Sequence, residues 1–196
     1  MKKTLLLASA AACIFAYSAN ANAQQMFGYE AKPYIGVDYI YTHADNKGIA
    51  NNLKKDYNSG DINVGVRLGE YAGLEAFYQQ SGNRTTKVWE SGAVFENKIK
   101  SRIYSYGLDL YGYLPLDCLN KFDLVASIGA ANLNMRVKGL PEGKYDKNHM
   151  AWRAGAGVQY NFNENMSARV MYRYSYVDTK YLDNLNEVVA GVRYSF

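Results

Sequence analysis

The chain has 196 residues, of which 48% are hydrophobic and 20% charged, and its formal net charge is +4. A helical multi-span membrane protein needs several runs of about 20 apolar residues, but the main apolar run here is a single short one at the extreme N-terminus. The 14% aromatic content excludes a disordered chain, and the small net charge argues against nucleic-acid binding.

The first 23 residues have the organisation of a secretory signal peptide. Two lysines at positions 2 and 3 precede an apolar region over residues 5–16, and Ala21-Asn22-Ala23 supplies a small-x-small cleavage pattern. We therefore expect cleavage before Gln24. This divides the chain into a signal peptide, residues 1–23, and one domain, residues 24–196. The mature domain has a net charge of about +2, which follows from losing the two lysines.

The two cysteines do not form a disulfide framework. A lipoprotein signal with Cys13 as the lipidated residue is an alternative to the cleavage above, although the Ala21-Asn22-Ala23 site fits better. After cleavage only Cys118 remains, and a lone thiol cannot form an intrachain bridge. We interpret Cys118 as a turn residue.

Eight segments of the mature chain alternate between apolar and polar residues. In Asp61–Gly69 the even positions are Ile, Val, Val and Leu, whereas the odd positions are Asp, Asn, Gly, Arg and Gly. A period of two predicts a strand with one apolar face. The eight predicted strands are Pro33–Tyr41, Asp61–Gly69, Gly73–Gln80, Tyr104–Leu114, Phe122–Met135, Ala151–Phe162, Ser167–Tyr176 and Glu187–Phe196.

The composition of the two faces favours a transmembrane barrel over a soluble sandwich. A sandwich exposes Lys and Glu on its outer faces. Here the polar face consists of Gly, Ser, Asn, Arg and a few acids, which suits a narrow barrel interior. The apolar face ends in Tyr or Trp, and the 19 tyrosines suit aromatic girdles at the membrane surfaces. We predict an all-β, eight-stranded antiparallel up-and-down barrel.

The connections between these strands alternate in length. Short turns are expected at Glu70-Tyr71-Ala72, Leu116–Lys121 and Asn163-Glu164-Asn165. Longer loops are expected at His43–Ser59, Ser81–Asn97, Lys138–Met150 and Asp178–Asn186. Short periplasmic turns and long extracellular loops are typical of outer-membrane barrels, and an even strand number places both termini in the periplasm.

The sequence resembles the eight-stranded outer-membrane barrel families, which include the membrane domain of outer membrane protein A and the opacity-type surface antigens. Tyr71–Tyr78 (YAGLEAFY), Tyr104–Tyr111 (YSYGLDLY) and the final Ala190–Phe196 (AGVRYSF) carry this resemblance. It implies that Tyr194 and Phe196 form the signal read by the barrel-assembly machinery. Because the sequence stops at Phe196, we expect no peptidoglycan-binding domain.

Charged residues on the inward positions form the most specific constellation. Acids occur on the first strands and most arginines on the later ones, so the two groups are expected to meet across a filled lumen. We prefer a structural polar plug to a gated ion path, since breaking such pairs leaves buried charge uncompensated. The residues of this predicted interior network are Asp38, Arg67, Glu75, Asp109, Arg153, Arg169, Arg173 and Arg193.

Two smaller groups of residues lie toward the extracellular side. Lys98, Lys100 and Arg102 keep the outward alternation above the apolar band, where they are candidates for contacts with lipopolysaccharide phosphates or are simply solvated. The only histidines, His43 and His149, lie on strands that are not neighbours. This favours neither a metal site nor lipid A chemistry.

We therefore expect a Gram-negative outer-membrane protein, exported through the periplasm, that is a surface-exposed structural or interaction protein of the surface-antigen or adhesin type. A small porin-like ion channel is the alternative, and a lipid A-modifying enzyme is less favoured. Expected partners are outer-membrane lipid and lipopolysaccharide, the barrel-assembly machinery and a host or surface ligand contacting the loops. We expect a monomer with no catalytic residues, cofactor, metal or nucleic acid.

Overall fold

The computed structural model describes residues 25–26, 29–46, 55–82, 84–88, 97–116, 121–140, 143–177 and 182–196. The predicted signal peptide, its cleavage site and Cys118 lie outside these described residues. Among the described residues, no helix has the length and apolar character needed to cross a membrane.

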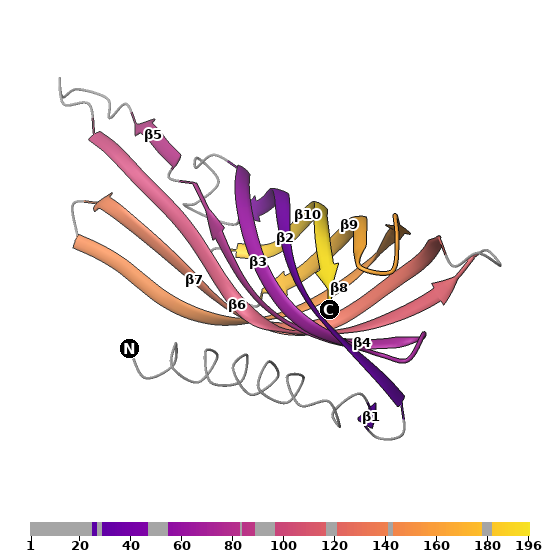
Figure 1. Ribbon diagram of the computed structural model, residues 1–196. Helices are drawn as coiled ribbons and strands as arrows, with labels where there is room; N and C mark the ends of the chain where they lie inside the picture. Colours follow the sequence, from indigo (N-terminus) through magenta and orange to yellow (C-terminus); the bar gives the residue numbers. More distant parts are fainter. Residues whose placement is uncertain are drawn as a thin grey trace.

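Eight long strands close into an antiparallel barrel (Figure 1). Each pairs with its neighbours in the order β2-β10-β9-β8-β7-β6-β4-β3, and the β2–β3 pairing closes the circle. The predicted eight-stranded up-and-down barrel is thereby confirmed. The eight strands are β2 (Tyr29–Asn46), β3 (Asp56–Leu68), β4 (Ala72–Ser81), β6 (Asn97–Pro115), β7 (Phe122–Leu140), β8 (Gly143–Asn161), β9 (Met166–Val177) and β10 (Leu182–Ser195). Two short strands, β1 (Gln25–Met26) and β5 (Arg84–Val88), pair with β2 and β6.

The alternation of the sequence becomes an inner and an outer face. Outward residues remain accessible, as Ile128 (64% exposed) and Trp152 (62%) show, whereas inward residues such as Ile40 and Val189 are fully buried. Soluble monomeric proteins rarely expose a continuous belt of large apolar side chains. Such a belt is the surface that a barrel presents to lipid.

One end of the barrel has tight turns. Gly69 adopts a positive φ of 59°, which glycine tolerates without strain, and it starts the turn from β3 to β4. Between β8 and β9, the Asn163 side-chain oxygen accepts hydrogen bonds from the backbone amides of Asn165 and Met166, at 3.0 and 2.7 Å. We call this end, which also holds Phe196, the turn end, and the opposite end the loop end.

The loop end contains more strand than the sequence predicted. Residues 138–150 were expected to form a loop, but β7 and β8 extend through them and leave only residues 141–142 between the strands. The segment predicted as the loop from Ser81 to Asn97 likewise contains β5, which pairs with β6. These expectations were wrong because backbone pairing continues beyond the apolar band, where side-chain alternation gives no signal. In Figure 1, β6, β7 and β8 project together at this end.

The barrel interior is also less polar than predicted. Two apolar clusters lie among the inward side chains. One contains Ala44, Tyr57, Phe77, Ala131, Leu133, Ala151, Val177 and Leu185. The other contains Ile40, Tyr111, Tyr113, Val125, Met171 and Val189. A purely polar plug was therefore too simple an expectation, because large apolar residues also occupy inward positions.

Candidate functional site

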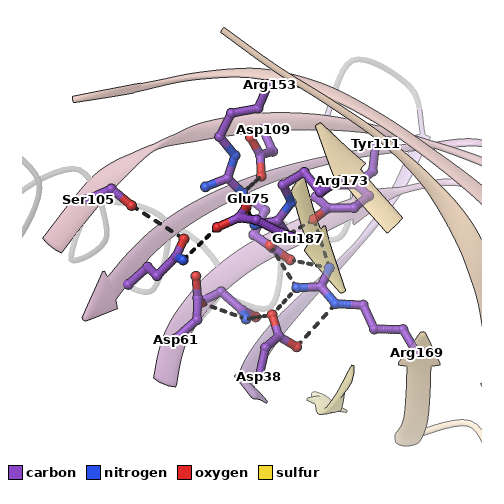
Figure 2. Close-up of polar contacts among 12 residues, drawn as sticks. Asp38, Asp61, Glu75, Ser105, Asp109, Tyr111, Arg153, Arg169, Arg173 and Glu187 are labelled. Atoms are coloured by element: carbon purple, nitrogen blue, oxygen red, sulfur yellow. Dashed lines mark hydrogen bonds and ion pairs between the residues drawn. The ribbon is translucent and has the colours of Figure 1, made fainter. Parts of the chain in front are cut away.

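The barrel interior contains a network of charged residues that come from all eight long strands. Figure 2 shows how carboxylates and guanidinium groups from opposite walls point toward one another. Of the eight residues predicted for this network, seven have almost no exposed surface, and Arg67 is half-buried. The structure adds Asp61, Asp123 and Glu187, which sequence reasoning left out of the network. Their inward parity on β3, β7 and β10 was the signal that could have found them.

Glu75 lies at the centre of this network. Its carboxylate accepts hydrogen bonds from the Tyr34 hydroxyl (2.9 Å) and the Tyr111 hydroxyl (3.2 Å). Arg169 donates to both carboxylate oxygens, at 3.1 and 3.2 Å, and Arg193 donates to one of them at 2.5 Å. Two arginines and two hydroxyls therefore satisfy one buried carboxylate, which balances its desolvation.

Asp38 extends the network to the wall formed by β2 and β3. Both of its oxygens accept hydrogen bonds from Arg169, which thereby bridges Asp38 and Glu75. Asp38 and Asp61 are paired across the β2–β3 ladder. The Asn63 amide donates to both, at 2.9 and 3.2 Å respectively. No ion pair within 4 Å joins Asp61 to the other described residues, so it differs from the other interior acids.

Two further ion pairs lie nearer the loop end. Arg153 donates to Asp109 at 2.6 Å, and its guanidinium lies 3.7 Å from the centre of the Phe77 ring. Arg173 lies 3.7 Å from Glu187, directly across the β9–β10 ladder. Glu187 also accepts hydrogen bonds from polar side chains on β2 and β4, at 3.1 and 2.8 Å. These contacts connect strands on different sides of the barrel in a second layer, closer to the loop end than the Glu75 cluster.

The turn end of the lumen is open. A vestibule of about 510 Å³ is lined by residues from several strands, including Tyr34, Arg67, Asp123 and Arg193. Arg67 donates to Asp123 at 3.0 Å and stacks over the Tyr113 ring, 4.3 Å from its centre. The vestibule ends at the Glu75 cluster, since Tyr34 and Arg193 belong to both.

The loop end of the lumen is filled. The cluster around Phe77 and Leu133 packs inward above the ion pairs. Between this cluster and the polar layer lies a cavity of about 20 Å³, lined by residues such as Gln79, Arg153 and Glu187. That volume holds about one water molecule. Paired charges and an apolar layer thus occupy the cross-section of the barrel.

The residues predicted near the extracellular rim lie on different strands and do not form one site. Arg102 is half-buried on the outward alternation of β6, and the side chains of Lys98 and Lys100 lie outside the described residues. His43 is 2.8 Å from the Asp56 carboxylate, and His149 lies on β8. Within the described ranges, no group of three or more His, Cys, Asp or Glu side chains is arranged to hold a metal ion.

The predicted assembly signal lies at the turn end. Tyr194 and Phe196 are both exposed, and their rings are in edge-to-face contact with centroids 5.2 Å apart. The Phe196 amide donates to the Pro33 carbonyl at 3.0 Å, which fastens the end of the chain to β2. This places an aromatic pair on the lipid side of the strand that closes the barrel.

Comparison with known proteins agrees with this architecture. The family described as "Outer membrane protein beta-barrel domain" matches residues 9–196. No curated protein matches the chain. Among solved structures, the chain is similar to Neisserial surface protein A (NspA), with a TM-score of 0.65 and 18% identity, covering 85% of this chain and 99% of that one.

Two further structures share the fold. The first is Ail, the attachment invasion locus protein of Yersinia pestis, in complex with the heparin analogue sucrose octasulfate. Its TM-score is 0.60 at 17% identity, over 85% of this chain and 99% of that one. The second is the N-terminal β-barrel domain of Pseudomonas aeruginosa OprF, with a TM-score of 0.57 at 15% identity over 85% and 100%. At these identities the similarity establishes the fold. Because the family match covers nearly the whole sequence, this chain belongs to the outer membrane protein β-barrel family.

Proposed function

We propose that this protein is a surface-exposed interaction protein of the Gram-negative outer membrane, of the surface-antigen or adhesin type. The observation that carries the proposal is the filled lumen. Paired charges around Glu75 and an apolar layer around Phe77 occupy it, and the cavity between them is about 20 Å³. A barrel built in this way is a rigid support rather than a conduit.

The strand extensions at the loop end support the same proposal. A tilted strand needs about 9–11 residues to cross a bilayer, whereas β6, β7 and β8 have 19 residues each. Close to half of each strand therefore extends beyond the hydrocarbon region. With the turn end in the periplasm, these extensions stand on the cell surface, where a rigid scaffold presents recognition residues.

A small ion channel is the second candidate. The vestibule of about 510 Å³ favours it, because ions can enter from the turn end as far as the Glu75 cluster. On this hypothesis the ion pairs would open transiently. Within the described part of the chain, the vestibule ends at the Glu75 cluster and the apolar layer around Phe77 lies beyond it. For that reason we prefer the interaction protein.

A planar bilayer experiment separates the two candidates. Refolded protein, with folding verified by heat-modifiable gel mobility, should leave the bilayer silent. Regular conductance steps that change in Glu75→Gln or Arg153→Gln would refute the plug and favour the channel.

The interaction role has a separate test. Bacteria displaying the full chain are compared, in adhesion to cultured epithelial cells, with bacteria displaying a variant in which a two-residue turn replaces residues 136–146, so that the paired residues Met135 and Lys147 flank the new turn. This removes the projecting β7–β8 hairpin and leaves the membrane-spanning part intact. Adhesion should fall toward that of cells lacking the protein. Equal adhesion of the two strains would contradict a role for this extension.

A further inference from the structure

The lipid-facing side of the barrel has a groove across four strands. Its volume is about 540 Å³, and its lining is almost entirely apolar. The groove exists because small residues face outward at its floor, where Ala130 pairs with both Leu108 and Trp152. Large side chains form its sides. The outward residues that line it are Leu74, Leu108, Leu110, Ile128, Ala130 and Trp152.

Basic residues lie on the same two strands, above this groove toward the loop end. The β6–β7 ladder runs without a shift from Pro115 to Lys100, so alternation is preserved along it. Arg102 pairs with Arg136 and Lys100 with Lys138, all at even positions, as are Leu108, Ile128 and Ala130. Lys98 continues the series on β6 and pairs with Lys87 of β5. One acid, Asp146 of β8, pairs with Arg136.

The strand register concentrates basic residues along this part of the β6–β7 ladder. Five basic residues share the sequence parity of Leu108 on β6 and β7, and the β8 register places one acid, Asp146, beside them. The described member, Arg102, has a buried Nε without a hydrogen-bond partner. Like charges on directly opposite residues of two paired strands destabilise the pairing. An anion bound between them would reduce this repulsion.

The spacing between groove and basic residues matches half a membrane. Leu108 lies six residues from the exposed Leu114 at the turn end and six residues from Arg102. Leu108 and the groove are therefore near the middle of the apolar band. Six residues span about 20 Å along a strand, or about 15 Å along the membrane normal at a tilt near 40°. Half of the hydrocarbon core is also about 15 Å thick.

We propose that the groove and the basic positions above it bind one lipopolysaccharide molecule, with an acyl chain in the groove and a lipid A phosphate at Arg102 and Arg136. The apolar groove suits an acyl chain, and the basic residues above it suit an anionic headgroup. A zwitterionic phospholipid has the acyl chain but no net negative charge. A second copy of this chain would bring a second set of cations to the same place. This lateral lipid site is additional to the proposed surface interaction and does not depend on it.

Trp152 provides a direct readout of groove occupancy. The chain has two tryptophans, so Trp89→Phe leaves Trp152 as the only one. The full protein is reconstituted in vesicles of dibrominated phosphatidylcholine, whose acyl chains quench tryptophan on contact. Diphosphoryl lipid A is then added at a small mole fraction, and dephosphorylated lipid A is added to a parallel sample.

Diphosphoryl lipid A should restore Trp152 fluorescence at least about fivefold more than its mole fraction alone accounts for. That factor corresponds to a single basic residue near an anionic surface. Recovery equal to that with dephosphorylated lipid A would overturn the proposal. A Trp152 that no brominated lipid quenches would also overturn it, because protein, such as a second copy, would then cover the groove.

Two pairs of variants separate the parts of the site. Arg102→Gln combined with Arg136→Gln should abolish the preference, whereas Lys32→Gln, at an exposed lysine of the turn end, should not change it. Ala130→Leu should fill the groove and also abolish the preference. Ala190→Leu, at an exposed outward position of β10, is its control. A preference that survives in both test variants would refute the site, provided that gel mobility shows them folded.

Discussion

Replacing Glu75 by Gln is the sharpest perturbation of the barrel interior. The substitution keeps the shape of the side chain and removes its charge. Arg169 would keep its contacts with Asp38, but Arg193 would keep only neutral partners, such as the Tyr113 hydroxyl at 3.0 Å and the Gln159 oxygen at 3.2 Å. The substitution therefore leaves a buried guanidinium without a counter-charge.

The contacts of Glu75 set the expected size of the effect. Two arginines donate to its carboxylate, and hydrogen bonds to charged groups contribute about 1.5–3 kcal/mol each. Removing one partner of a buried ion pair costs about 3–5 kcal/mol. We therefore expect Glu75→Gln to lower the free energy of unfolding by about 3–5 kcal/mol, which is more than a hundredfold in the equilibrium constant.

Urea unfolding in lipid vesicles, followed by tryptophan fluorescence, measures this loss. Asp61→Asn is the matched control, because Asp61 is buried nearby but, among the described residues, accepts a single side-chain hydrogen bond, from Asn63 at 3.2 Å. We therefore expect a change below about 1 kcal/mol. Adding Arg193→Gln to Glu75→Gln should cost less than the sum of the single losses, since it removes the orphaned charge. Equal stabilities of the Glu75 and Asp61 variants would refute the idea that the paired charges stabilise the barrel.

Three further predictions concern packing and assembly. Gly191→Ala should lower the folded fraction seen as heat-modifiable gel mobility and lower the free energy of unfolding by about 1–3 kcal/mol, because the new Cβ would clash with the Asp38 carboxylate of β2. Gly60→Ala is the control and should fold normally, because a Cβ there has no atom within 4 Å. Phe77→Ala should lower the unfolding free energy by about 3–5 kcal/mol through a cavity in the inner apolar layer, and a loss below about 1 kcal/mol would contradict that layer. Phe196→Ala should slow insertion into the outer membrane in cells, measured by the rate at which protease-resistant barrel appears, while refolding in detergent is unchanged. Phe122→Ala, an exposed aromatic of the same end, should insert at the normal rate.

The sequence determined the architecture because a strand in a barrel has two environments and a period of two. Ile62 faces outward, toward lipid, and the next residue, Asn63, faces the filled lumen; the same alternation recurs in all eight strands. The inward positions of Asp38, Glu75 and Arg169 follow from the same alternation. Strand ends did not follow from it, since backbone pairing in β7 and β8 continues past the segments whose residues alternate between apolar and polar.

Only the tertiary structure decided which charges meet. Closure brings Arg193 of β10 against Glu75 of β4, residues 118 positions apart, at a distance set by barrel size and stagger. The same closure leaves Asp61 without an ion pair among the described residues, and it stacks apolar residues such as Phe77 above the polar layer. The lipid-facing groove likewise depends on the strand register that places Ala130 between Leu108 and Trp152. Alternation assigns a residue to a face, whereas register and closure choose its neighbours.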